Sequence, residues 1–219
     1  SVAIIGVIAS VIVYNHSKFD SDLEINNVAY RLALSIRQAQ VYGISAREVA
    51  GATGNSFSRY YGLHFKNASP SGLNFTTSSW IFFSDTNDNG KYRTGTTRPG
   101  EDGFCEADGS INECIEKTVI GRGISINGMR GFRSGNWYTL SALSAADVLF
   151  KRPNPDAIFN LYLGNYTTSG SNNNRCGGSA CEGVAVCLQS LQGRKKRVVV
   201  LSTGQISVEN VTNGVPPCG

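Results

Sequence analysis

The first fourteen residues, SVAIIGVIASVIVY, contain no charged side chain. As a helix this run would be about 20 Å long, short of the roughly 30 Å hydrocarbon core of a bilayer. A cleavable secretory signal fits it poorly, because no basic segment precedes the run and no small-x-small cleavage site follows it. Alone the run does not span a membrane, and we expect it to begin a longer helix.

An amphipathic pattern continues directly from this run. Its apolar residues recur at spacings of three and four, while Asp22, Arg31, Arg37 and Gln38 fall on other faces. The predicted buried stripe consists of Ile25, Val28, Ala29, Leu32, Ile36 and Ala39. We therefore expect a helix over residues 1–52, with an apolar membrane or filament-core half and then an amphipathic half. Gly43 is tolerated inside it, and Gly51 or Gly54 ends it.

After the helix, the apolar period changes from 3.6 to 2, which indicates strands. The predicted strands are Arg59–Phe65, Asn74–Ser84, Lys117–Ile126, Ala146–Arg152, Ala157–Leu163, Val184–Leu191 and Arg197–Ser202, with a terminal hairpin through Ser202–Gln205. Strands that follow one helix predict an α+β fold, in which the helix packs on an antiparallel β-sheet head with disulfide-bonded loops. Residues 53–219 would form this β-rich globular head.

The composition and the cysteine content indicate in which cellular compartment the chain folds. With 219 residues and 41% apolar content, the chain can bury one core, and its 25 glycines suit a turn-rich body. A net charge of +4 is too mild to predict nucleic-acid binding. All six cysteines lie from residue 105 onward, without a Cys-x-x-Cys motif, so we favour disulfides in an oxidising compartment over a metal site. The favoured pairs are Cys105 with Cys114, Cys176 with Cys181, and Cys187 with Cys218.

The N-terminal run resembles the later portion of the first helix of type IV pilins and type II secretion pseudopilins. The next stretch, NNVAYRLALSIRQAQVYGISARE, resembles the GspH- and FimT-like members of that family. The family's processing site, aromatic residue and buried glutamate are not visible, and we interpret the sequence as beginning part way along the mature helix. The alternative is an unrelated buried or membrane-anchoring helix. The resemblance covers the first fifty residues well and the rest weakly.

The resemblance implies a structural subunit of an extracellular filament rather than an enzyme. The subunit would be anchored in the inner membrane before pilus or secretion machinery assembles it into a helical homo-oligomer. The residues expected to pack in the filament core are Ile4, Ile5, Val7, Ile8, Val11 and Ile12. Two alternatives stay open: a minor or tip pilin or pseudopilin that binds surfaces or DNA, and a membrane-anchored β-domain that does not polymerise.

One loop carries a calcium-like pattern. Asp85, Asn87 and Asn89 place oxygen-bearing side chains at alternate positions before Gly90, which suits a hard cation. The twelfth loop position is Thr96 rather than an acid, so further ligands would have to come from elsewhere, such as Glu101 or Asp102. No cofactor is required by the rest of the sequence, and the alternative is an ordinary Asn/Asp/Gly turn.

A second loop carries four consecutive cations, Arg194, Lys195, Lys196 and Arg197. A basic loop could contact phosphates of DNA, although such a run is more often a solvated hairpin turn. Catalysis finds little support, because no Gly-x-Ser-x-Gly, His-Glu-x-x-His or phosphate-binding glycine loop is present. We interpret His64, inside a predicted strand, as packed or exposed rather than catalytic.

Overall fold

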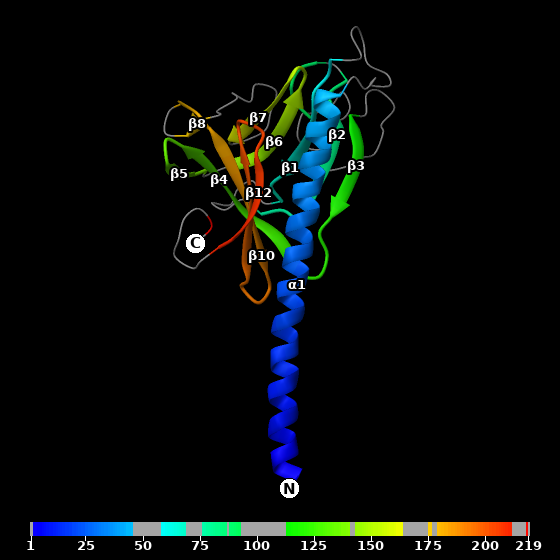
Figure 1. Ribbon diagram of the computed structural model, residues 1–219, viewed down its shortest axis with the longest axis vertical. Helices are drawn as coiled ribbons and strands as arrows, with labels where there is room; N and C mark the ends of the chain where they lie inside the picture. Colours follow the sequence, from blue (N-terminus) through cyan, green and yellow to red (C-terminus); the bar gives the residue numbers. More distant parts are fainter. Residues whose placement is uncertain are drawn as a thin grey trace.

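The computed structural model of the chain describes residues 2–45, 58–68, 76–86, 88–92, 113–140, 143–163, 175–176, 179–211 and 218. Its helix, α1 (Val2–Ile44), begins as a stem that projects from the head and then runs along the head (Figure 1). Within α1, side chains are described for Ile4 and from Asp20 onward. Gly51 and Gly54, the predicted ends of the helix, lie outside the described residues.

The predicted amphipathic stripe of α1 is confirmed. All six of its residues are buried, and Ala29, Leu32, Ile36 and Ala39 are fully shielded from solvent. This stripe faces strands of both large sheets, because α1 contacts β1 and β6 of one sheet and β10, β11 and β12 of the other. One hydrophobic core therefore lies where the helix and the two sheets meet.

The first sheet has five antiparallel strands in the order β3-β2-β1-β6-β7. They are β1 (Tyr61–Lys66), β2 (Ser79–Ser84), β3 (Cys114–Val119), β6 (Leu143–Lys151) and β7 (Asn154–Leu163). Its inner face contributes Leu63, Phe82 and Phe150 to the main core. Its other face carries a smaller cluster of Ile81, Phe83, Tyr92 and Leu149.

The second sheet also has five antiparallel strands, in the order β12-β11-β10-β4-β5. They are β4 (Ile124–Arg133), β5 (Asn136–Thr139), β10 (Gly183–Ser190), β11 (Lys195–Leu201) and β12 (Ile206–Asn210). A separate short pair joins β8 (Arg175–Cys176) to β9 (Ser179–Ala180). The predicted terminal hairpin is present as β11 and β12.

The expected fold class, an α+β fold with a helix on one antiparallel sheet head, is wrong. The chain is mostly β, and its strands form two five-stranded antiparallel sheets. The predicted strand Lys117–Ile126 shows the reason. Arg122 and Gly123 have φ values of 56° and 72°, so the chain turns there and leaves the first sheet for the second. A single predicted strand is thus divided between β3 and β4.

Candidate functional surfaces

The outward face of α1 carries exposed apolar side chains along the head. Leu23, Tyr30, Leu34 and Val41 are 47%, 59%, 67% and 49% exposed. Their spacings are seven, four and seven, which places all four within about 40° of one another around the helix axis. This stripe was not predicted from the sequence, although the spacing of its four residues is visible there. We call these four residues the outer stripe.

The stem bears the predicted filament-packing residues. Ile4 is 66% exposed, whereas the side chains of Ile5, Val7, Ile8, Val11 and Ile12 lie outside the described part of the structure. Figure 1 shows the backbone of the stem extending well away from both sheets. Among the described residues, no helix is long and apolar enough to cross a membrane.

Two of the three predicted disulfides are confirmed. Cys176 is bonded to Cys181 with their Cα atoms 5.0 Å apart, and Cys187 is bonded to Cys218 with a Cα separation of 5.7 Å. Cys114 is also disulfide-bonded. Its predicted partner, Cys105, lies outside the described residues. The Cys187 bond attaches the segment beyond β12 to strand β10.

In the candidate calcium loop, the Asp85 side chain caps a turn. Asp85 is fully buried, and its carboxylate accepts the backbone N–H groups of Asn89 at 3.3 Å and Gly90 at 2.6 Å. The Asn89 side-chain oxygen accepts the N–H of Lys91 at 2.8 Å. Asn87, Thr96, Glu101 and Asp102 lie outside the described residues, within which no cluster of three metal-ligating side chains occurs. Calcium binding stays a prediction.

A buried polar cluster lies on the outer face of the first sheet. Nδ1 of His64 is 2.6 Å from Oδ1 of Asp147, its cross-strand neighbour, and both side chains are shielded from solvent. Oδ2 of Asp147 accepts hydrogen bonds from the Tyr162 hydroxyl at 2.8 Å and the Tyr92 N–H at 3.3 Å. The Tyr92 ring also lies against the His64 ring. Of the two predicted alternatives for His64, packed or exposed, the structure shows the packed one.

The four consecutive cations do not form one loop. Lys195, Lys196 and Arg197 lie in β11, and only Arg194 belongs to the turn. Because side chains alternate along a strand, Lys195 and Arg197 share one face of the sheet and Lys196 occupies the other. Arg197 pairs with Glu209 at 2.7 Å and lies over the Trp137 ring. The Arg194 Nε atom is 3.0 Å from Oδ1 of Asp22 on α1.

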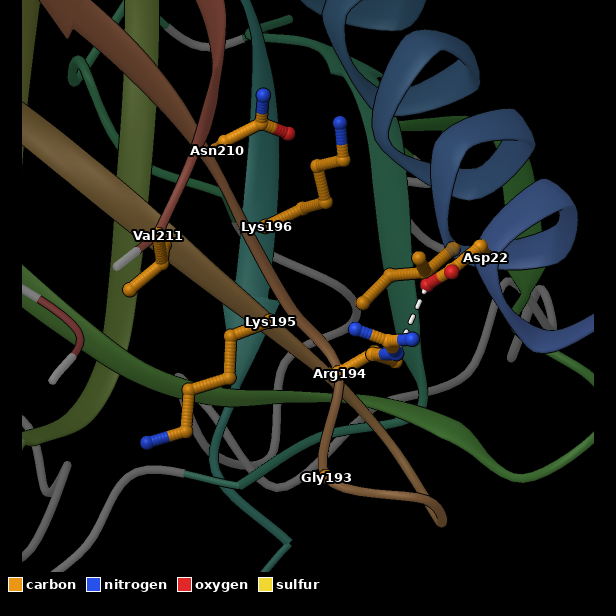
Figure 2. A pocket seen from close by; sticks show the side chains of 8 residues that line it. Asp22, Gly193, Arg194, Lys195, Lys196, Asn210 and Val211 are labelled. Carbon is orange, nitrogen blue, oxygen red and sulfur yellow. Dashed lines mark ion pairs between the residues drawn. The ribbon is translucent and has the colours of Figure 1, made fainter. Parts of the chain in front are cut away.

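A cleft of about 290 Å³ lies between α1, the β10–β11 hairpin and the end of β12 (Figure 2). Its lining consists of Asp22, Ile25, Gly193, Arg194, Lys195, Lys196, Asn210 and Val211. We call it the basal cleft, because it lies where the stem leaves the head. On the other face of β11, Lys195 lines a smaller hollow with Arg130, and burial lowers the pKa of the Arg130 guanidinium.

Comparisons with models of known protein families, with curated proteins and with solved structures found no match for this chain.

Proposed function

We propose that this chain is a structural subunit of an extracytoplasmic filament that polymerises through its N-terminal helix. The observation that carries the proposal is the outer stripe, in which Leu23, Tyr30, Leu34 and Val41 are exposed on the face of α1 opposite to the head core. Burying one such side chain fully is worth about 1.5–3 kcal/mol. An exposed row of apolar side chains at one helical phase favours a protein partner.

The outer stripe favours polymerisation over simple anchoring. An anchor needs apolar surface only where it enters lipid, but the outer stripe runs along the part of α1 that packs on the head. In sequence, Ile5 and Ile12 have nearly the same helical phase as Leu23 and Tyr30, because each is separated from its counterpart by eighteen residues, or five turns. The helical phase of these two stem residues therefore matches that of the outer stripe.

The partner that matches this face is the stem of another copy. Two helices with apolar faces pack by interdigitating their side chains, which requires no change in the head. Because the stem and the outer stripe are different parts of the chain, their contact is head-to-tail, and such a contact generates an open helical array when its rotation does not close a ring. Before assembly, the inner membrane would cover the stem, and pilus or secretion machinery would transfer it into the filament core.

The test compares substitutions on the two surfaces. We expect Ile8→Asp and Leu34→Lys each to abolish incorporation into filaments, because each introduces a charge into an apolar helix contact. The control is Arg31→Glu, which changes an exposed residue of α1 about 80° away from the outer stripe. Leu34→Lys should leave the thermal unfolding midpoint of the head unchanged, since Leu34 is exposed.

Electron microscopy of native cells with antibody against the head gives the readout. We expect label along the whole length of thin filaments for the unmodified protein and for Arg31→Glu. Normal filaments from both Ile8→Asp and Leu34→Lys would contradict the proposal. Label confined to filament tips would instead identify a minor or tip subunit, and label confined to the envelope would identify an anchored domain.

A further inference from the structure

Lys196 lies on the face of β11 whose other residues are part of the hydrophobic core. It is opposite Leu188 in the neighbouring strand, and the next residues on its face of β11, Val198 and Val200, are fully buried. Lys196 is itself half-buried, and within the described part of the chain it forms no ion pair. A nearby anion stabilises an ammonium group that lies against a hydrophobic core, because partial burial removes part of the hydration of the charge.

The surroundings of Lys196 supply further donors for such an anion. Figure 2 shows the Lys196 and Asn210 side chains on one side of β11, beside α1, while Lys195 points to the other side. Arg194 enters the basal cleft from the turn, and Asp22 holds its Nε atom. The guanidinium keeps its remaining N–H groups for other acceptors, because one contact to Nε uses one of five donors. An ammonium, a guanidinium and an amide thus line the basal cleft.

We propose that the basal cleft binds one phosphate group. Its volume of about 290 Å³ is large enough to admit a compact oxyanion. Lysine and arginine are the side chains that bind phosphate oxygens through charge-assisted hydrogen bonds. A nucleic-acid strand fits less well, because a strand needs cations along one track and β11 divides its cations between two faces. This inference does not depend on filament assembly.

Two sources could present this group: free phosphate or a phospholipid headgroup. The position of the cleft at the exit of the stem would bring it near a bilayer surface whenever the stem is in lipid. The first arm of the test titrates inorganic phosphate into the full chain in neutral detergent at constant ionic strength, followed by calorimetry. The second arm measures head stability in phosphatidylcholine nanodiscs with and without phosphatidylglycerol.

We expect Lys196→Gln to weaken phosphate binding about tenfold, the typical effect of losing one hydrogen bond to a charged group. Asp22→Asn should strengthen binding, because it removes the only carboxylate that lines the basal cleft and releases Arg194. The control is Arg152→Gln, an exposed cation in the β6–β7 turn, which should leave binding unchanged. Thermal unfolding of each variant checks that the head is folded.

The outcomes separate the two sources. Stabilisation by phosphatidylglycerol that Lys196→Gln abolishes would identify the lipid headgroup, and phosphate binding without such stabilisation would identify free phosphate. Absence of both phosphate binding and stabilisation by phosphatidylglycerol for the unmodified chain would overturn the proposal. Binding that neither Lys196→Gln nor Asp22→Asn alters would overturn it as well, because the phosphate would then lie elsewhere.

Discussion

Gly43 of α1 lies directly against the backbone of Phe150 in β6. A β-carbon added to Gly43 would be 2.6 Å from the Phe150 carbonyl oxygen and 2.8 Å from its Cβ atom. Real β-carbons essentially never come so close to backbone atoms, so this contact requires glycine. From the sequence, Gly43 is predicted only to be tolerated inside a helix, whereas in the structure the glycine allows the helix to pack closely against the sheet.

We therefore expect Gly43→Ala to destabilise the head by about 1–3 kcal/mol, the usual cost of overpacking a close contact. Helix propensity alone would favour alanine by about 1 kcal/mol, so the sign of the change tests the contact. The measurement is urea unfolding followed by circular dichroism. Gly121→Ala is the control, because a β-carbon there would meet no atom within 4 Å. Equal or higher stability of Gly43→Ala would show that α1 can move away from β6.

The buried cluster around Asp147 gives a second prediction. Asp147→Ala should lower the free energy of unfolding by about 3–5 kcal/mol, because it leaves His64 and two other donors without their shared acceptor. Tyr162→Phe removes one of these hydrogen bonds and should cost about 0.5–1.5 kcal/mol. Chemical denaturation of both variants measures the difference.

A double-mutant cycle between His64→Ala and Asp147→Ala isolates the pair itself. Residues in direct contact inside one network typically show an interaction energy of about 0.5–3 kcal/mol. We expect a value in this range, because the two side chains are 2.6 Å apart and shielded from solvent. Strict additivity of the two substitutions would show that the contact contributes nothing to stability.

Local patterns were the part of the fold that the sequence predicted well. The buried stripe from Ile25 to Ala39 follows from helical periodicity, which depends on residues three and four apart. The Cys176–Cys181 bond also closes a short loop, and it was predicted as a pair that follows once Cys105 is paired with Cys114. The outer stripe is also present as a spacing in the sequence, because Leu23, Tyr30, Leu34 and Val41 share one helical phase. Spacing alone does not show whether such a face is packed or exposed, and only the burial of the residues in the structure does.

Sheet membership could not be predicted in the same way. Whether a strand joins one sheet or another depends on pairing between distant segments, such as β4 with β10. The register of β11 depends on pairing of the same kind, since its alignment with β10, in which Lys196 is opposite Leu188, assigns Lys196 to the core side. A run of four cations therefore looked like one basic loop in sequence, although its members point to two faces and contact different partners.

The two confirmed disulfides should contribute unequally to stability. The Cys187–Cys218 bond closes a loop with a sequence separation of 31, and the Cys176–Cys181 bond closes one with a separation of 5. The loop-entropy relation then gives about 4 kcal/mol for the longer loop and about 2 kcal/mol for the shorter one. Paired Cys→Ser substitutions at each bond, compared by thermal unfolding, measure the two contributions.

The opposite order of the two disulfide contributions would contradict this prediction. Cys176 is fully buried and lies beside Gly131, so its bond also fills space in the core. If removing the Cys176–Cys181 bond costs more than removing the Cys187–Cys218 bond, packing rather than chain entropy dominates. Mass spectrometry of the unreduced protein confirms that each variant retains its other disulfides.

The Asp85 turn yields the last prediction. Because the Asp85 carboxylate is buried and accepts the N–H groups of Asn89 and Gly90, we expect the turn to form without a metal ion. Asp85→Ala should then destabilise the head by about 2–3 kcal/mol, since hydrogen bonds to charged groups contribute about 1.5–3 kcal/mol each. Asn89→Ala, which changes an exposed residue of the same turn, should cost less than about 1 kcal/mol.

Chelation distinguishes this turn from a calcium site. A bound ion stabilises the folded state in proportion to the logarithm of its concentration above the dissociation constant. We therefore expect the thermal midpoint to be the same in excess chelator and in millimolar calcium. A midpoint that calcium raises for the unmodified chain but not for Asp85→Ala would establish the ion instead. In that case, the ion would share the Asp85 carboxylate with the two backbone N–H groups, because each carboxylate oxygen has a second lone pair.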